Sequence, residues 1–311
     1  MQNETIHNII TIQVEHRPIE IVILSGWRAG TIDYLRLVGG ECIYNSHVYV
    51  CVVVTFVVYT FRHIRPRDWE GDFLKLNFLH SLVSLRHPYH VKVGSLPTSG
   101  SYIIMEFIEF AIFIHQSLCV QSVLGKKLGE MHKAGKSFKG FGFDVNNTIG
   151  STPQINNWKS DWVEFFAEHR LGFQLKLAKE QFGDSTIYEK GERLMKNLGP
   201  LFENVAIEPC LLHGDLWSGN VSADKDGEPV ILDPACYYGH NEAEFGMSWC
   251  AGFGGSFYNS YFEVMPKQPG FEKRKDLYML YHYLNHYNLF GSSYRPSALS
   301  IIDDYLRMVK V

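Results

Sequence analysis

The sequence predicts an α+β fold in which a small β-rich lobe precedes a larger, mainly helical lobe. The first observation is that short runs of β-branched and aromatic residues dominate up to residue 109, whereas helical spacing dominates beyond it. The second is that 46% of the 311 residues are hydrophobic and 14% are aromatic, enough for one large or two ordinary cores. We therefore expect an unassigned segment over residues 1–30, the small lobe over 31–109 and the helical lobe over 110–311.

Charge, hydropathy and cysteine spacing narrow the classes of partner. The chain has 29 basic and 33 acidic residues, a net charge of −4, so no global positive field favours nucleic acid or an anionic membrane. The most hydrophobic run, Val48–Phe61, is shorter than the roughly 20 residues that a spanning helix needs, which favours a buried strand. The six cysteines form no C-x-x-C pair and we expect no secretory leader, so we predict free thiols and a cytoplasmic location.

The predicted small lobe contains a glycine turn, one helix and a strand. Residues 37–50 read LVGGECIYNSHVYV, which predicts a strand, a tight turn at the paired glycines and a returning strand that could cover a phosphate. Apolar residues then recur at helical spacing over residues 73–85. Ser101–Glu106 has the composition of a strand, and we expect it to enter a hinge over residues 106–109.

The predicted helical lobe encloses a short β-like island. Periodic apolar residues separated by Gly-, Asn- and Pro-bearing loops predict helices over residues 123–134, 158–177 and 187–201. The island, Cys210–Asp233, comprises a loop, a turn at Asp226-Gly227 and a strand over Val230–Leu232. Polar residues concentrated at such an island are candidates for chemistry.

The island carries the strongest chemical signal in the chain. Residues 211–220 read LLHGDLWSGN, and residues 229–234 read PVILDP. Phosphoryl transfer needs a carboxylate that deprotonates the acceptor hydroxyl, and oxygen ligands that hold Mg²⁺ against the phosphates. Asp215 fits the first role, while Asn220, five positions later, and Asp233, at the end of an apolar strand, fit the second. The alternative is that Asp, Asn and Gly here are ordinary turn residues.

These stretches resemble the fructosamine/ketosamine-3-kinases, within the aminoglycoside and choline phosphotransferase-like branch of the protein-kinase fold. The motifs that carry the resemblance are LLHGDLWSGNV and PVILDPACYYGHNEAEF, with further similarity upstream in KGFGFDVNNTIGSTPQINNWKSDWVEFFAEHRL. The resemblance covers residues 123–311 and implies a bilobal protein-kinase-like fold.

The resemblance also implies an activity. Such enzymes use ATP and Mg²⁺ to phosphorylate the O3 hydroxyl of sugar-amine adducts (ribulosamine, psicosamine or fructosamine), on proteins or free amines. The product is unstable, so the amine is freed. The expected partners are therefore glycated proteins or small ketosamines.

Site residues follow from the same resemblance. Asp215 is the implied base, and Asn220 and Asp233 are the implied metal ligands. The implied nucleotide-binding residues are Gly39, Gly40, Cys42, Met105, Glu106, Phe107 and Ile108. The implied substrate-binding residues, for which core packing remains the alternative, are Trp217, His240, Glu242, Gln154 and Trp158. Tyr281 to His286 is a further candidate for acceptor recognition.

The chain departs from the family where an ATP-binding lysine is expected, because residues 50–67 contain none. Arg62 or Arg65 could replace it, although Arg and Lys are not equivalent as phosphate ligands. The chain could instead be a non-catalytic pseudokinase that binds glycated amines. A third explanation, favoured by the VYVCVVV run typical of a GT-rich stretch, is that residues 1–30 and 44–68 derive from a wrongly assigned exon.

Two further alternatives concern the acceptor and the thiols. The kinase could act on choline-like or aminoglycoside-like acceptors instead of ketosamines. Cys42, in the glycine turn, is a redox candidate, so a monomer and a redox-linked dimer are both compatible with the sequence.

Overall fold

The computed structural model describes residues 85–88, 108, 110 and 117–310 in full, together with the backbone of the strands up to residue 106. By contact clustering, the chain divides into two compact units: Met1–Glu70 with Pro88–Ile108, and Gly71–His87 with Glu109–Val311. The strands of the first unit are β1 Ile6–Val14, β2 Arg17–Leu24, β3 Asp33–Leu35, β4 Glu41–Tyr44, β5 His47–Val50, β6 Phe56–Phe61, β7 His90–Ser95 and β8 Ser101–Glu106.

In the first unit, a four-stranded sheet has the order β3-β6-β8-β7, with antiparallel neighbours. The predicted strand at Ser101–Glu106 is confirmed as β8, whose two neighbours place it inside this sheet. The predicted hairpin around the paired glycines is wrong, because β3 pairs with β6 while β4 pairs with β5. Asn-Ser between β4 and β5 is itself a turn-favouring pair.

The run Val48–Phe61 forms two strands rather than one, because β5 and β6 pair with different partners. Several other expectations of the small lobe lie outside the described residues: the 73–84 part of the expected helix, the glycines Gly39 and Gly40, and Phe107.

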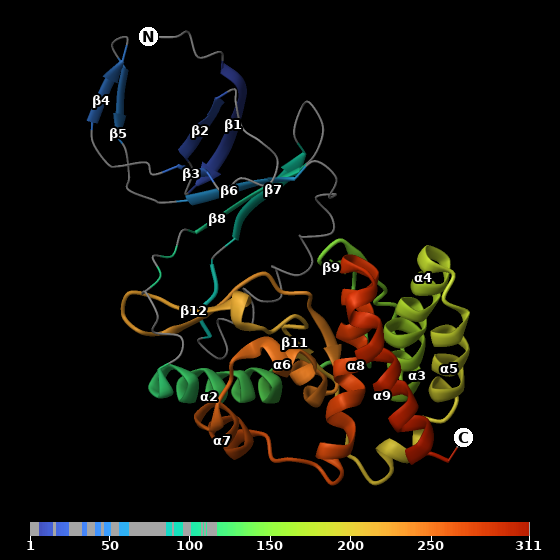
Figure 1. Cartoon of the computed structure of the whole chain (residues 1–311). Helices are drawn as coiled ribbons and strands as arrows, with labels where there is room; N and C mark the ends of the chain where they lie inside the picture. Colours follow the sequence, from blue (N-terminus) through green and yellow to red (C-terminus); the bar gives the residue numbers. More distant parts are fainter. Residues whose placement is uncertain are drawn as a thin grey trace. The chain divides into compact units, whose positions relative to one another are not determined.

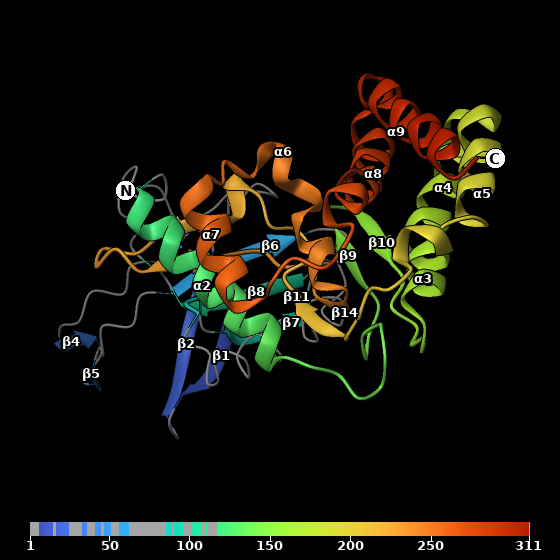
Figure 2. The ribbon, with the colours of Figure 1, turned by 90° about the horizontal axis from the view of Figure 1, so that it is seen from below.

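In the second unit, α2 (Leu118–Ala134) confirms the first expected helix and starts five residues earlier than the expected residue 123. It packs closely on α7 (Gly255–Val264), as both views show (Figures 1 and 2). Gly125 permits this approach, since a Cβ there would lie 2.1 Å from the Phe257 carbonyl oxygen. Gly135 ends α2 and donates its N–H to the Met131 carbonyl oxygen at 2.8 Å.

The second expected helix begins later than predicted. Asp161 caps α3 (Trp162–Phe165), its carboxylate accepting the Glu164 N–H at 2.8 Å, and the helix continues as the π-helix η2 (Phe166–Gly172) and α4 (Phe173–Phe182). Residues 158–160 stay out of the helix because Lys159 pairs with Phe141 in a β-bridge.

The third expected helix is shorter than predicted. Asp184 caps α5 (Ser185–Met195), and the 3₁₀ turn η3 (Gly199–Phe202) replaces its expected C-terminal end. A proline at position 200, inside that expected helix, opposes helix continuation.

The remaining elements complete the helical unit. Helices α8 (Phe271–Phe290) and α9 (Arg295–Met308) lie beside α4 and α5 (Figures 1 and 2). The short strands pair antiparallel as β9 (Asn147–Ile149) with β10 (Thr152–Gln154), β11 (Cys210–Leu212) with β14 (Tyr237–Gly239), and β12 (Val221–Ala223) with β13 (Pro229–Ile231). The other short helices are η4 Ser218–Asn220, η5 Asn241–Met247, α6 Ser248–Ala251 and η6 Ser292–Tyr294.

A continuous apolar core joins these elements around α3, η2 and β11. Trp162, Phe165 and Phe166 are at most 2% exposed and pack as an aromatic cluster, with ring centroids of Trp162 5.8 and 5.5 Å from those of the two phenylalanines. The island predicted around residues 210–233 is built on this core, since β11 is buried along its whole length. Within the described part of the chain, no helix combines the length and the apolarity required to cross a bilayer.

Candidate active site

Asp215, Asn220 and Asp233 meet in the β-island of the helical unit. Asp215 lies in the loop after β11, Asn220 ends η4, and Asp233 stands two residues after β13. The Asn220 side-chain amide donates to the Asp215 carbonyl at 2.9 Å, to the Asp215 Oδ2 at 3.3 Å and to the Asp233 carbonyl at 3.3 Å. The residues expected as base and metal ligands are therefore linked through one amide group.

Backbone contacts lock the two loops that carry these residues. The Ala235 N–H donates to the His213 carbonyl at 2.8 Å, and the Leu232 N–H donates to the Asn220 carbonyl at 2.9 Å. Gly214 has φ +83°, and a Cβ there would lie 2.1 Å from the Ala235 carbonyl oxygen. The middle position of the His-Gly-Asp sequence therefore requires glycine for two independent reasons.

His213 has a structural role in the loop. Its buried Nε2 donates to the Leu232 carbonyl at 2.7 Å, and its Nδ1 accepts the Asp215 N–H at 3.3 Å. Burial lowers the pKa of His213, although the nearby Glu244 carboxylate opposes this shift. A neutral ring protonated on Nε2 satisfies both hydrogen bonds, so His213 orients the loop.

Glu244 is a site residue that sequence reasoning missed. It lies in η5 and is 2% exposed. Its Oε2 accepts the His213 N–H at 2.7 Å and its Oε1 accepts the Gly214 N–H at 3.0 Å. Both backbone donors immediately before Asp215 are thus held by one carboxylate, two positions beyond the acid that the sequence singled out, Glu242.

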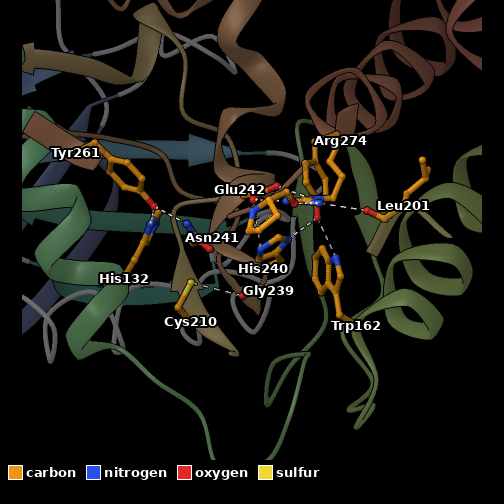
Figure 3. Close-up of polar contacts among 12 residues, drawn as sticks. His132, Trp162, Leu201, Cys210, Gly239, His240, Asn241, Glu242, Tyr261 and Arg274 are labelled. Atoms are coloured by element: carbon orange, nitrogen blue, oxygen red, sulfur yellow. Dashed lines mark hydrogen bonds and ion pairs between the residues drawn. The ribbon is translucent and has the colours of Figure 1, made fainter. Parts of the chain in front are cut away.

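Glu244 stays ionised because further donors surround it. His132 on α2 lies with Nε2 3.1 Å from the Glu244 Oε2, while its Nδ1 lies 2.8 Å from the Tyr261 hydroxyl. The Tyr261 hydroxyl also accepts from the Asn241 amide at 3.0 Å, and Figure 3 shows His132, Tyr261 and Asn241 in this chain of contacts. Burial alone would raise the pKa of Glu244, but the His132 hydrogen bond and the neighbouring charges outweigh it and lower the pKa.

The pKa values of the two site aspartates shift upward. Burial, followed by the negative charges of Asp233 and Glu244, raises the pKa of Asp215 to about 7. Burial also raises the pKa of Asp233, opposed by His213, even though the Asp233 residue retains substantial solvent-accessible surface. Two acidic groups that resist ionisation together form a place where a cation is favourable.

The ligand set fits Mg²⁺ held jointly by protein and nucleotide. Over the described residues, no group of three or more His, Cys, Asp or Glu side chains gathers to hold a metal. Mg²⁺ commonly uses one or two protein ligands and completes its octahedron with water and phosphate oxygens. Asn220 suits this role because its hydrogen bonds engage the amide nitrogen, which leaves the oxygen Oδ1 as the ligand atom.

His240 and Glu242, expected on the substrate side, lie in the core. Glu242 forms a two-point ion pair with Arg274, with Nε–Oε2 and Nη2–Oε1 distances of 2.8 and 2.7 Å (Figure 3). His240 is 1% exposed, with Nδ1 2.7 Å from the Tyr278 hydroxyl, and burial together with Arg274 lowers its pKa to about 3. Their burial favours the core-packing alternative.

Gln154 is also buried but contacts the metal loop. Its amide donates to the Ala235 carbonyl at 3.0 Å, and its Oε1 accepts the Tyr281 hydroxyl at 2.8 Å. Gln154 therefore positions the chain that follows Asp233.

The two expected tryptophans lie nearer the surface. Trp158 is half-buried, with its ring 5.8 Å from that of Tyr238, and Trp217 is 37% exposed immediately beside the catalytic loop. Trp217 is therefore accessible to an acceptor.

The nucleotide-binding expectations fall mainly outside the described side chains. Cys42 belongs to β4, and Met105 and Glu106 belong to β8, for which only the backbone is described. Arg62 and Arg65 lie outside the described residues.

Comparison with known proteins supports one relationship. The profile of the fructosamine kinase family matches residues 25–308. The chain is 64% identical to the chloroplastic protein-ribulosamine 3-kinase of Oryza sativa subsp. indica over 293 residues, covering 94% of this chain and 84% of that protein. It is 64% identical to the Arabidopsis thaliana protein of the same name, covering 94% and 89% of the two chains. It is 38% identical to the ketosamine-3-kinase of Mus musculus, covering 85% and 92%.

Solved structures show the same fold. A candidate fructosamine-3-kinase from Haemophilus somnus superposes with a TM-score of 0.72 at 24% identity, covering 82% of this chain and 84% of that one. An aminoglycoside phosphotransferase superposes with a TM-score of 0.52 at 16% identity, covering 90% and 94%. These similarities establish a bilobal, protein-kinase-like fold.

Proposed function

Since the chain belongs to the fructosamine kinase family, we propose that it is an ATP-dependent ketosamine 3-kinase. The observation that carries the proposal is the Asn220 amide, which contacts both Asp215 and Asp233 and so joins the base to the metal loop. The 64% identity to proteins named as ribulosamine 3-kinases supports ribulosamine as the first acceptor to test. Psicosamine and fructosamine, on proteins or free amines, are the neighbouring candidates.

Asp215 supplies the proton acceptor in the proposed reaction. The O3 hydroxyl of the ketosamine gives its proton to the Asp215 carboxylate while O3 forms a bond to the γ-phosphorus of ATP. The bond between that phosphorus and the β–γ bridging oxygen breaks, and ADP leaves. A pKa of about 7 suits Asp215 to this task, because a base works best when its pKa lies near the working pH.

Asn220 and Asp233 would hold Mg²⁺, which when bound neutralises the charge on the β- and γ-phosphates. Glu244 and His213 keep Asp215 in place through the backbone N–H groups of the catalytic loop. Positioning of this kind accounts for much of catalysis in phosphoryl transfer.

The missing lysine sets the competing proposal. A protein that keeps the sugar-facing lobe but cannot hold ATP would bind ketosamines without turnover. Replacement of the lysine by Arg62 or Arg65, and a wrongly assigned exon over residues 44–68, are the other two explanations. A sequenced transcript that runs uninterrupted through this segment would exclude the exon explanation.

The deciding experiment measures ATP turnover by the purified chain with Mg²⁺ and a ribulosamine-modified peptide, beside Asp215→Asn. We expect ADP release that depends on the ribulosamine and falls at least about 1000-fold in the variant. Choline and an aminoglycoside serve as competing acceptors, and faster turnover of either would replace the ketosamine proposal. Ketosamine binding by calorimetry without turnover would favour the pseudokinase.

The compartment and oligomeric state are also proposals. The described cysteines, among them Cys119 and Cys250, are free thiols, as a reducing compartment predicts. We keep the cytoplasmic expectation, and the plant relatives named as chloroplastic make the stroma the alternative. Fluorescent fusion of the full-length protein distinguishes the two, while size exclusion with and without reductant tests a dimer linked through Cys42.

A further inference from the structure

Two stacked aromatic side chains lie at the surface of the helical unit. Trp249 on α6 is 40% exposed, and its ring lies 5.1 Å from that of Tyr283 on α8 with an interplanar angle of 18°. His286, one turn further along α8, meets Trp249 edge-on at 5.4 Å. Phe290 continues the series, 64% exposed and with its ring 5.3 Å from that of His286. Large exposed aromatic groups arranged in this way are typical of binding surfaces.

This aromatic platform, defined as Trp249 and Tyr283, adjoins the catalytic loop. Helix α6 packs against η4, which carries Asn220 and follows Trp217. Next to Trp249, burial and then the negative charge of Asp215 raise the pKa of the Cys250 thiol to about 11, so this segment lies within electrostatic reach of the base. The surface therefore continues from the residue that takes the O3 proton to the stacked rings.

We infer that the aromatic platform binds the amine-bearing side of the ketosamine, meaning the nitrogen and the lysine stem of a glycated polypeptide. The inference rests on the proposed ketosamine kinase function.

The chemistry of the acceptor supports this assignment. O3 and the amine nitrogen are separated by four bonds, so with O3 at Asp215 the nitrogen lies on the order of 5 Å away, and a lysine stem extends beyond it. A ketosamine nitrogen is a protonated secondary amine at neutral pH, and the faces of Trp and Tyr attract such cations. The methylenes of a lysine stem also pack well on an aromatic face. A carrier of this kind uses both properties of the platform, whereas a small neutral group would use neither.

Burial separates this platform from the aromatic residues that only build the core. Tyr278, Tyr281 and Tyr287 on the same helix are at most 4% exposed, and Tyr278 and Tyr281 are tied to His240 and Gln154 by hydrogen bonds. Trp249 has no comparable burial, so its stacking on Tyr283 leaves the outer face of the indole for a ligand.

The test compares Trp249→Ala, Trp249→Phe and a matched control, Phe182→Ala. Phe182 is 45% exposed and stacks on Tyr287 of the same helix at 4.6 Å, but belongs to α4. With a ribulosamine-modified lysine peptide, we expect Trp249→Ala to raise KM about tenfold with little change in kcat, and Trp249→Phe to raise it about threefold. Phe182→Ala should leave KM unchanged. Calorimetric titration of the peptide without ATP should show the same losses in Kd.

A second pair of acceptors separates the carrier from the sugar. The same sugar on methylamine offers no lysine stem, so the Trp249→Ala penalty should shrink to about twofold or less with that acceptor. An equal penalty on both acceptors would overturn the carrier assignment in favour of the sugar. An unchanged KM and Kd for the peptide in folded Trp249→Ala would overturn the platform while leaving the kinase function standing. If the wild-type protein neither binds nor phosphorylates the peptide, the proposed function itself fails and the inference falls with it.

Discussion

Replacing Glu244 by Gln tests how the catalytic loop is held. The carboxylate accepts N–H groups from His213 and Gly214 and contacts His132, all away from solvent. Glutamine keeps one acceptor oxygen and turns an NH₂ group toward a backbone donor, so at least one buried N–H loses its partner. That loss costs about 1–3 kcal/mol, and weakening the charge-assisted bonds adds about 1 kcal/mol. We therefore expect a loss of about 3 kcal/mol in the free energy of unfolding.

The same substitution should change activity and its pH dependence. A loop that shifts by a fraction of an ångström misplaces Asp215, so we expect kcat to fall about 10- to 100-fold. The Glu244 charge is one cause of the raised Asp215 pKa, so its removal should move the acid limb of kcat/KM to lower pH. Denaturant unfolding and a pH–rate profile with the ribulosamine peptide measure both effects.

Glu242→Gln is the matched control for this prediction. Glu242 is as buried as Glu244 and loses a two-point ion pair with Arg274, so stability should fall by a similar amount. It makes no recorded contact with the catalytic loop among the described residues, so the acid limb should stay in place. An acid limb that moves equally in both variants, or in neither, would refute the role of Glu244 in positioning Asp215.

Three further predictions follow from other parts of the site. The pH profile of kcat/KM in the wild-type enzyme should fall below about pH 7 with the uptake of one proton, because Asp215 must be ionised to act as base. Asp215→Asn should abolish turnover yet raise the midpoint of thermal unfolding at pH 8, where the raised pKa makes the ionised carboxylate unfavourable in the folded protein, with a gain of about 1–3 kcal/mol. By the same linkage the gain should vanish below about pH 4, and a gain that persists there would contradict it. Gly125→Leu should destabilise the protein by about 3 kcal/mol or more, since its side chain meets the Phe257 backbone, and scanning calorimetry measures the loss.

The site's chemistry could be predicted from sequence because it lies in one short segment. Asp215 and Asn220 share one loop and Asp233 ends the following hairpin, so spacing alone placed them together. Glu244 escaped prediction because it reaches the loop only through the packing of η5 against β11, and nothing in its local pattern distinguishes it from Glu242.

Strand pairing in the small lobe failed for a related reason. Local composition correctly marked strands, but partners depend on contacts distant in sequence, and β6 pairs with β3 and β8 instead of closing a hairpin with its neighbour β5. Helix ends were misplaced where a cap or a proline took precedence over hydrophobic spacing, as at Asp161 and Pro200.

The three carboxyl groups near the catalytic loop acquire different properties from their donors. Glu244 is the most deeply buried, yet its pKa is lowered, because backbone N–H groups and His132 surround it. Asp215 is less buried, but in the folded protein its carboxylate accepts only the long Asn220 hydrogen bond while facing two other negative charges, and its pKa rises. Hydrogen-bond donors, more than depth of burial, therefore decide which acid is a fixed anchor and which can exchange a proton. The anchor keeps its charge at the pH where the base titrates, so the loop retains its geometry throughout the proton transfer.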